Sequence, residues 1–180
     1  PIGDDEPVQV VTKNIAQELK DAHFSYKIDD SNKTPGFKFA QAEVEGYPIR
    51  IEIGKKDLAS HEVTVVRRDT LEKIKYSIEE VVSSLDSLLQ NIQKNMYDKA
   101  LKRRDSMIYE ANSWEEFKNI AQNKPGFIKA NWCGDVACEE KIKDEFSMKS
   151  RCLIDDEEIH TSCVVCGKEA KYRLYFGKQY

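Results

Sequence analysis

The stretch that decides the fold runs from Thr34 to Asp57 and reads TPGFKFAQAEVEGYPIRIEIGKKD. Its opening Pro-Gly predicts a turn, residues 39–44 fit about two turns of helix, and Gly46 followed by Pro48 ends that helix. Isoleucines then alternate with charged residues over 49–53, which predicts a strand that stops at Gly54. The stretch therefore places aromatic and charged side chains on short elements, a layout suited to a planar, polar ligand.

The segments around this stretch predict an open α/β sheet. Apolar residues at spacings of three and four indicate an amphipathic helix over 6–22, whereas alternation over 24–28 and a β-branched run over 63–66 indicate strands. Ligands of open α/β sheets usually bind at the strand ends. Pro1-Ile2 resembles the tail of a further, truncated strand, so we expect the chain to be a fragment of a longer protein.

The second half of the chain predicts a long helix and then a small α+β domain. Helical spacing of apolar residues begins at Ser77 and extends toward residue 108, and Ser113 with Glu116 forms a capping box for a helix that ends near Asn123. After Pro125-Gly126 we expect a strand over 127–132, a helix over 138–146 and a last strand over 170–176. We thus predict an α/β domain at 1–76, a helical connection at 77–123 and a terminal domain at 124–180.

Composition describes an ordinary soluble protein. The 180 residues are 40% hydrophobic and 33% charged with a net charge of −4, and neither a membrane-spanning run nor a signal peptide is visible. We therefore expect a cytoplasmic protein without a membrane partner. The negative net charge argues against indiscriminate binding of RNA or DNA, so any nucleic-acid contact must come from a local patch.

The cysteines indicate a metal site. Four of the five form two close pairs, Cys133 with Cys138 and Cys163 with Cys166, and two such pairs make a closed tetrahedral thiolate site that suits a structural Zn²⁺. His160 could replace one thiolate. Cys152 stands alone and is expected to be a packed small hydrophobe.

No catalytic signature is present. The three histidines are scattered, and the sequence contains no nucleophile elbow, glycine-rich phosphate loop or zinc-protease helix. We therefore predict no catalytic residue in this chain.

Order and spacing of motifs are more informative than composition. The Thr34–Leu58 stretch, followed by Val65-Val66-Arg67-Arg68-Asp69-Thr70, resembles the anticodon-binding domain of prolyl-tRNA synthetase. The segments around the four paired cysteines and the closing Tyr175-Phe176-Gly177-Lys178-Gln179-Tyr180 resemble the C-terminal zinc-binding domain of the archaeal and eukaryotic-type enzyme. Where that family usually has Gly-Pro, this chain has Gly54-Lys55.

The resemblance implies a function and a set of site residues. It implies recognition of the anticodon of tRNA(Pro) within a homodimeric, ATP- and Mg²⁺-dependent proline–tRNA ligase whose class II catalytic domain lies upstream and receives the carboxylate of Tyr180. Guanine-stacking and edge-reading roles would fall on these residues: Phe39, Glu43, Arg50, Lys56 and Asp57. Lys73 and the basic end of the long helix are candidates for phosphate contacts.

A second hypothesis stays open at this stage. The same domains could form a free-standing adaptor that binds RNA or protein and carries a structural zinc site. The incomplete first strand counts against that hypothesis, because a free-standing protein would not truncate its central sheet.

Overall fold

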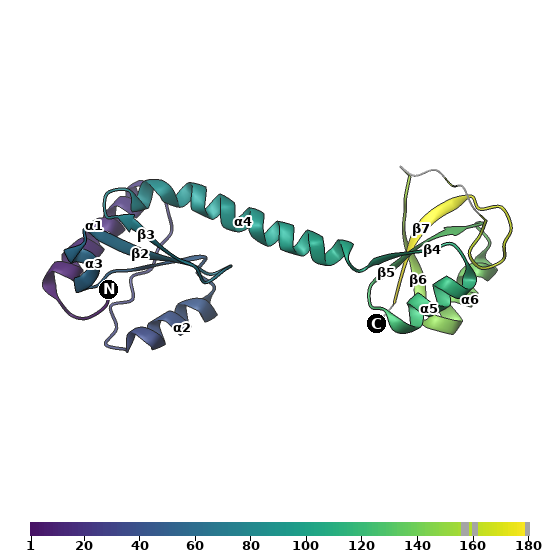
Figure 1. Ribbon diagram of the computed structural model, residues 1–180, viewed down its shortest axis with the longest axis horizontal. Coiled ribbons are helices and arrows are strands. Elements are labelled where there is room, and N and C mark those ends of the chain that lie inside the picture. The colour runs from purple at the N-terminus through teal and green to yellow at the C-terminus, as the bar shows by residue number, and fades with distance from the viewer. Residues whose placement is uncertain (156–158, 160–161, 179–180) are drawn as a thin grey trace. The chain divides into compact units, whose positions relative to one another are not determined.

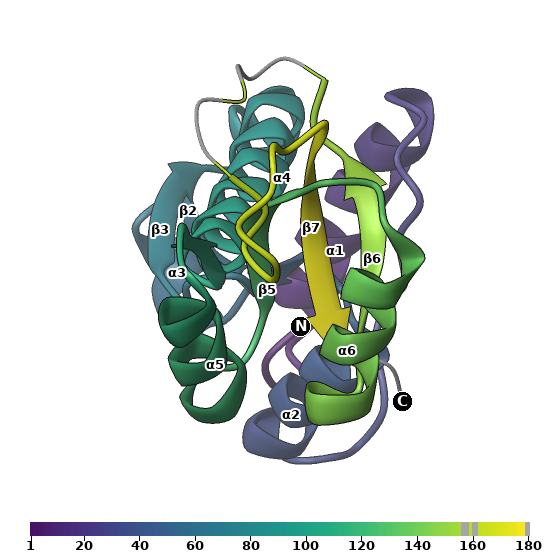
Figure 2. The same ribbon diagram turned by 90° about the vertical axis from the view of Figure 1, so that its right-hand side faces the viewer.

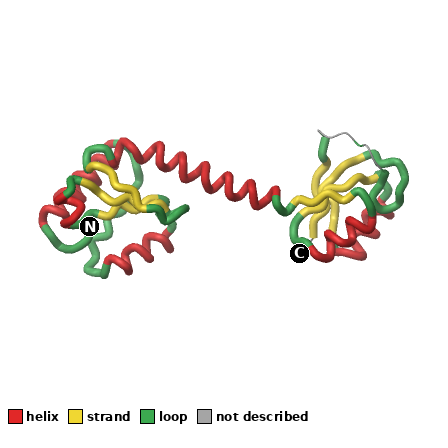
Figure 3. The backbone as a smooth tube through the Cα atoms, viewed as in Figure 1, coloured by secondary structure: helices red, strands yellow, loops and turns green. Residues whose placement is uncertain are grey.

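The computed structural model describes residues 1–155, 159 and 162–178. The chain divides into two compact units, which we call unit 1 (Pro1–Asp98) and unit 2 (Lys99–Tyr180) (Figures 1 and 3). The predictions for His160 and Tyr180 fall outside the described residues. Within the described part of the chain, no helix combines the length and apolar character needed to cross a membrane.

Unit 1 is built on the antiparallel sheet β1 (Ile49–Glu52), β2 (Glu62–Arg67) and β3 (Lys73–Ser77). Side chains of a strand alternate between the two faces. One face is apolar, because Ile51 and Ile53 point the same way as Val63 and Val65 across the β1–β2 register. This face forms the core with α1 (Glu6–Asp21) and the first half of α4 (Val81–Asp105).

The opposite face of the sheet, here called the polar face, follows from the same register. Arg50 pairs with Val66, and Thr64 pairs with both Glu52 and Lys75. The side chains on this face are those of Arg50, Glu52, Glu62, Thr64, Val66, Lys73, Lys75 and Ser77. An alternating sequence on β1 thus separates isoleucines for the core from charges for a surface.

Helix α2 (Pro35–Glu45) contacts this polar face. Proline suits a first helical turn, the Thr34 hydroxyl accepts the Phe37 N–H at 3.4 Å, and Gly46 closes the helix with φ +88°. The predicted helix is confirmed, although it begins at Pro35 and includes the expected turn. None of its residues is buried, so α2 rests on polar contacts more than on a packed core.

The charged segment after β1 is a short helix, α3 (Lys55–Ala59). The Asp57 carboxylate accepts the Gly54 N–H at 3.0 Å, which caps the helix. Lys55 occupies the first helical position, where proline is favoured, so the replacement of proline by lysine keeps the helix start in place.

Unit 2 contains a mixed sheet with the order β4-β5-β7-β6. Its strands are β4 (Ile108–Ala111), β5 (Phe127–Trp132), β6 (Met148–Leu153) and β7 (Tyr172–Lys178). Helices α5 (Trp114–Asn123) and α6 (Val136–Phe146) both pack on the face that carries Ile128, Ala130, Leu174 and Phe176 (Figure 2). The α/β class is confirmed, with antiparallel pairing in the first sheet and a parallel β4–β5 pair in the second.

Two kinds of local prediction were wrong. Residues 24–28 form no strand, because alternation favours a strand only where a neighbouring edge pairs with it; they instead line a cavity beside β1. Strands β3, β4 and β6 were not predicted from the sequence. All three are edge strands with few buried residues, and they lack the continuous apolar run that marks the inner strand β2.

Candidate nucleic-acid interface and metal centre

Phe39 and Arg50 form the centre of the polar face. The Arg50 guanidinium lies 4.3 Å from the centroid of the Phe39 ring, and the Lys73 ammonium lies 5.8 Å from the same centroid. Both distances fall within the range of cation–π attraction. With Glu43 and Glu52, which bind these cations, the residues form what we call the Phe39 cluster.

The two carboxylates of the Phe39 cluster differ in exposure. Glu52 is 6% exposed and accepts from Arg50 Nε at 3.0 Å, while its second oxygen lies 3.4 Å from Lys73 Nζ. Glu43 has a side chain that is 45% exposed and accepts from Arg50 Nη1 at 3.2 Å. Arg50 is therefore fixed on its buried side and paired with a solvent-facing partner on the other.

A second group of polar side chains, the Asp57 cluster, occupies the same face. It contains Asp57 on α3, Thr64 on β2 and Lys75 on β3, and Lys56 precedes Asp57 on α3. Asp57 Oδ1 accepts from Thr64 Oγ1 at 3.1 Å and from Lys75 Nζ, and Oδ2 accepts the Gly54 N–H. Burial of Asp57 opposes its ionisation, but these three hydrogen bonds outweigh burial and lower its pKa.

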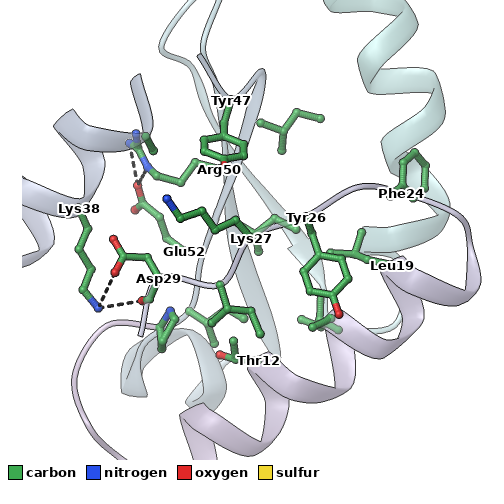
Figure 4. A pocket seen from close by; sticks show the side chains of 18 of the residues that line it. Thr12, Leu19, Phe24, Tyr26, Lys27, Asp29, Lys38, Tyr47, Arg50 and Glu52 are labelled. Atoms are coloured by element: carbon green, nitrogen blue, oxygen red, sulfur yellow. Dashed lines mark hydrogen bonds and ion pairs between the residues drawn. The ribbon is translucent and has the colours of Figure 1, made fainter. Parts of the chain in front are cut away.

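Unit 1 also holds a cavity of about 260 Å³ between α1, residues 24–29, α2 and β1 (Figure 4). Leu19 and Phe24 line one part of it, and the Arg50–Glu52 and Lys38–Asp29 ion pairs line another. Figure 4 draws two ion pairs at this cavity, Lys38 with Asp29 and Arg50 with Glu52. Because Phe39, Arg50 and Glu52 also line it, the cavity adjoins the Phe39 cluster.

The β2–β3 connection is tied to α4 by a separate network. Arg67 donates from Nε and Nη2 to the two oxygens of Asp69 at 3.0 and 2.8 Å, and Nη1 donates to Asn91 at 2.9 Å. The bond from Arg67 is the main reason that the pKa of Asp69 falls to about 2. The network holds the sheet edge next to the Phe39 cluster against the core helix.

In unit 2 the four paired cysteines meet. Cys133 follows β5, Cys138 lies in the first turns of α6, and Cys163 and Cys166 lie in the turn before β7. Their sulfur atoms all lie within 4.8 Å of one another, and Cys133 Sγ is 3.7 Å from the sulfurs of both Cys138 and Cys166. The four cysteines are positioned to bind one metal ion.

Two of these cysteines have backbone donors that suit thiolates. The Lys168 N–H donates to Cys166 and lowers the pKa of that thiol to about 7. The Asp135 N–H donates to Cys133, whose pKa burial nevertheless raises. A glycine separates each donor from its cysteine, and Gly134 and Gly167 have φ of +90° and +73°. The left-handed conformation turns each N–H back toward the sulfur.

Cys152 differs from the other four. It lies on β6, outside the cluster, and is exposed, so the expectation of a packed small hydrophobe was wrong. Its neighbour Leu153 is 53% exposed as well, because β6 is an edge strand. A hydrophobic residue type at an edge strand does not ensure burial.

Both halves of the chain match known protein families. Residues 1–88 match the family model described as anticodon binding domain, and residues 114–180 match the model described as prolyl-tRNA synthetase, C-terminal. The proline–tRNA ligase of Lachnospira eligens is 46% identical over 92% of this chain and 35% of its own length; that of Clostridium novyi is 48% identical over 86% and 32%. The chain belongs to the prolyl-tRNA synthetase family. It spans about a third of the length of these curated relatives.

A solved structure shares the fold. A crystal structure of prolyl-tRNA synthetase from Cryptosporidium parvum, complexed with L-proline and AMP, superposes with a TM-score of 0.90 at 35% identity, over 100% of this chain and 39% of that one. The matched region is thus the C-terminal part of a prolyl-tRNA synthetase. L-Proline and AMP are ligands of the Cryptosporidium protein.

The site residues predicted from the sequence fall into both clusters of the polar face. Phe39, Glu43, Arg50 and Lys73 come together, whereas Lys56 and Asp57 lie on α3. Sequence reasoning missed three members: Glu52, Thr64 and Lys75. The spacing of Glu52 from Arg50 by two residues on one strand was a signal that could have identified it.

Proposed function

We propose that the chain reads the anticodon of tRNA(Pro) for a proline–tRNA ligase and does so with the polar face of unit 1. The observation that carries this proposal is the Phe39 cluster, in which an aromatic ring and an anchored guanidinium lie together on an anticodon-binding domain. Unpaired anticodon bases are splayed out, stacked on aromatic side chains and hydrogen-bonded on their edges.

Guanine can bind the Phe39 cluster by replacing the Arg50–Glu43 ion pair with hydrogen bonds between each residue and the base. Its O6 and N7 accept hydrogen bonds, and its N1–H and N2–H donate them. Arg50 and Glu43 now satisfy each other. A guanine that enters beside Phe39 offers an acceptor edge to Arg50 and a donor edge to Glu43, so both charges keep partners when their ion pair opens.

We assign the second guanine of the anticodon to the Asp57 cluster. Lys73 and Lys75 lie two residues apart on β3, which separates them by about 7 Å, and each belongs to one cluster. We assign edge reading there to the exposed Lys56. Because both oxygens of Asp57 bind within the protein, we assign Asp57 the role of holding the start of α3 in place.

The test is the binding of an anticodon stem-loop with the sequence UGG to the 180-residue chain. Arg50→Ala and Glu43→Ala should each weaken binding by about 1–3 kcal/mol, the discrimination expected from a good bidentate contact. Lys20→Ala, an exposed change on α1, is the control for lost positive charge. Affinities within about threefold of the unaltered chain for both cluster variants would contradict the assignment.

We further propose that the metal is Zn²⁺ in a structural role. In a tetrahedral site with Zn–S bonds of about 2.3 Å the sulfurs lie about 3.8 Å apart, close to the 3.7 Å of the two short pairs here. Four thiolates complete the coordination shell, so the ion would stabilise the turn before β7 and the start of α6.

Metal analysis of the purified chain tests the zinc proposal. We expect about one equivalent of zinc for the unaltered chain and for Cys152→Ser, and a large loss for Cys163→Ser. Less than about half an equivalent in the unaltered chain would overturn the proposal.

The remaining activities of the parent enzyme also stand as proposals. These are ATP- and Mg²⁺-dependent attachment of proline to tRNA by a class II catalytic domain, a homodimeric parent and a cytoplasmic location. The family supports them. An open reading frame with class II motifs upstream of residue 1 is the observation that tests them.

A further inference from the structure

We propose that Glu52 is a positioning residue that sets the base specificity of the Phe39 cluster. The inference rests on the proposed anticodon function and adds a residue that makes no contact with the base. Glu52 is 6% exposed, whereas the two cations that it binds reach solvent or the ring of Phe39. It therefore acts through Arg50 and Lys73.

Each oxygen of Glu52 holds a different cation. Oε1 accepts from Arg50 Nε at 3.0 Å and forms an ion pair with Arg50 Nη2 at 3.0 Å, and Oε2 lies 3.4 Å from Lys73 Nζ. Figure 4 shows Arg50 and Glu52 directed toward each other along β1. A buried carboxylate is costly unless it is paired and hydrogen-bonded, so the pairing keeps all three side chains in one arrangement.

This arrangement decides which part of Arg50 remains for a ligand. Glu52 binds the Nε side of the guanidinium, so Nη1 projects toward Glu43 and the Phe39 carbonyl, at 3.2 and 3.3 Å. Glu43 is exposed and can exchange partners, whereas Glu52 stays in place. When guanine replaces Glu43 as the partner of Arg50, Glu52 keeps the guanidinium oriented toward guanine O6 and N7. This orientation reduces the entropy cost of ordering the Arg50 side chain on binding.

If Glu52 positions Arg50, removing its charge should weaken RNA binding, whereas a simple charge effect would strengthen it. RNA binding improves when negative charge near the phosphates is removed, and that improvement is independent of sequence. Loss of a positioning carboxylate instead weakens binding of the correct base and leaves the wrong base nearly unaffected.

The experiment compares the UGG stem-loop with one in which the first guanine, and then the second, is replaced by adenine. For Glu52→Gln we expect the preference for guanine over adenine at one of these positions to fall about tenfold. Glu52→Asp keeps the charge but withdraws the carboxylate, and should show a similar fall. Glu18→Gln, an exposed change on α1, is the control for net charge.

Three further measurements separate the possible outcomes. In an Arg50→Ala background, Glu52→Gln should lower the affinity for the UGG stem-loop by less than about a further twofold, because Glu52 sets the guanine preference mainly through the Arg50 guanidinium. Three outcomes in the Glu52 variants would overturn the role of Glu52. All stem-loops could bind more tightly by the same factor, or all could bind more weakly by the same factor while the Tm of the protein falls. The preference for guanine over adenine could also stay unchanged in both variants. Arg50→Ala and Glu43→Ala variants that both keep full affinity would instead contradict the proposed anticodon function of the cluster.

Discussion

The polar face of unit 1 and the cysteine cluster of unit 2 both bring several ionisable side chains close together, but their charges are compensated in different ways. On the polar face, carboxylates and cations bind each other, as Glu52 does with Arg50 and Lys73. The cysteine cluster brings four thiols within 4.8 Å of one another, and each of them becomes negative when it ionises. The first is complete by itself, whereas the second requires a positive ion before its thiols can ionise together.

The largest expected effect is therefore on unit 2 when metal is removed. A chelator should unfold unit 2 and leave unit 1 folded, with a loss of several kcal/mol; structural zinc contributes about 10–16 kcal/mol in isolated zinc fingers. Both tryptophans, Trp114 and Trp132, belong to unit 2, so their fluorescence reports this unfolding selectively. Unchanged tryptophan fluorescence after chelation would contradict the prediction that unit 2, unlike unit 1, needs a metal ion to fold.

The next effect concerns the aromatic ring at the centre of the polar face. Phe39→Ala should weaken stem-loop binding by about 1–3 kcal/mol, the usual contribution of stacking on one base, and Phe39→Tyr should preserve most of it. Phe37→Ala is the matched control, because Phe37 lies on the same helix and is 54% exposed. Equal losses for Phe37 and Phe39 would show that α2 as a whole, not the cluster, carries binding.

The pairing of charges within unit 1 should also make its stability depend on pH. Asp69 has its pKa lowered to about 2, so the stability that it contributes is present above the unfolded value near 4 and is lost as pH falls through about 2. Asp69→Asn should cost about 1–2 kcal/mol at pH 7. The difference between variant and unaltered chain, from urea unfolding, should shrink toward zero near pH 2. Asp4→Asn, an exposed change, should show no such trend.

The smallest effect is a stabilisation of unit 1. Lys55 begins α3 after Gly54, whose φ of −135° and ψ of 176° suit a residue before proline. Lys55→Pro should raise the free energy of unfolding by about 0.4–1 kcal/mol, because proline restricts the unfolded chain. Lys55→Ala separates this gain from loss of the ion pair with Asp5. A destabilised proline variant would mean that α3 needs a different start.

The sequence by itself determined the features that depend on neighbouring residues. The capping interactions at Ser113 and Glu116 were predicted correctly because their partners lie three or four residues apart. The cysteine pairs Cys133–Cys138 and Cys163–Cys166 were predicted for the same reason. The family resemblance, carried by ordered local motifs, was likewise readable and is confirmed.

Only the tertiary structure decided which distant residues share the polar face. Strand register brings Thr64 beside Glu52 and Lys75, and no local pattern fixes that register. The tertiary structure also decided that residues 24–28, despite their alternation, line a cavity instead of forming a strand, and that β3 supplies two of the lysines. Cross-strand partners are set by packing of the whole sheet against its helices, so the pairing of Glu52 with Lys73 became visible only in three dimensions.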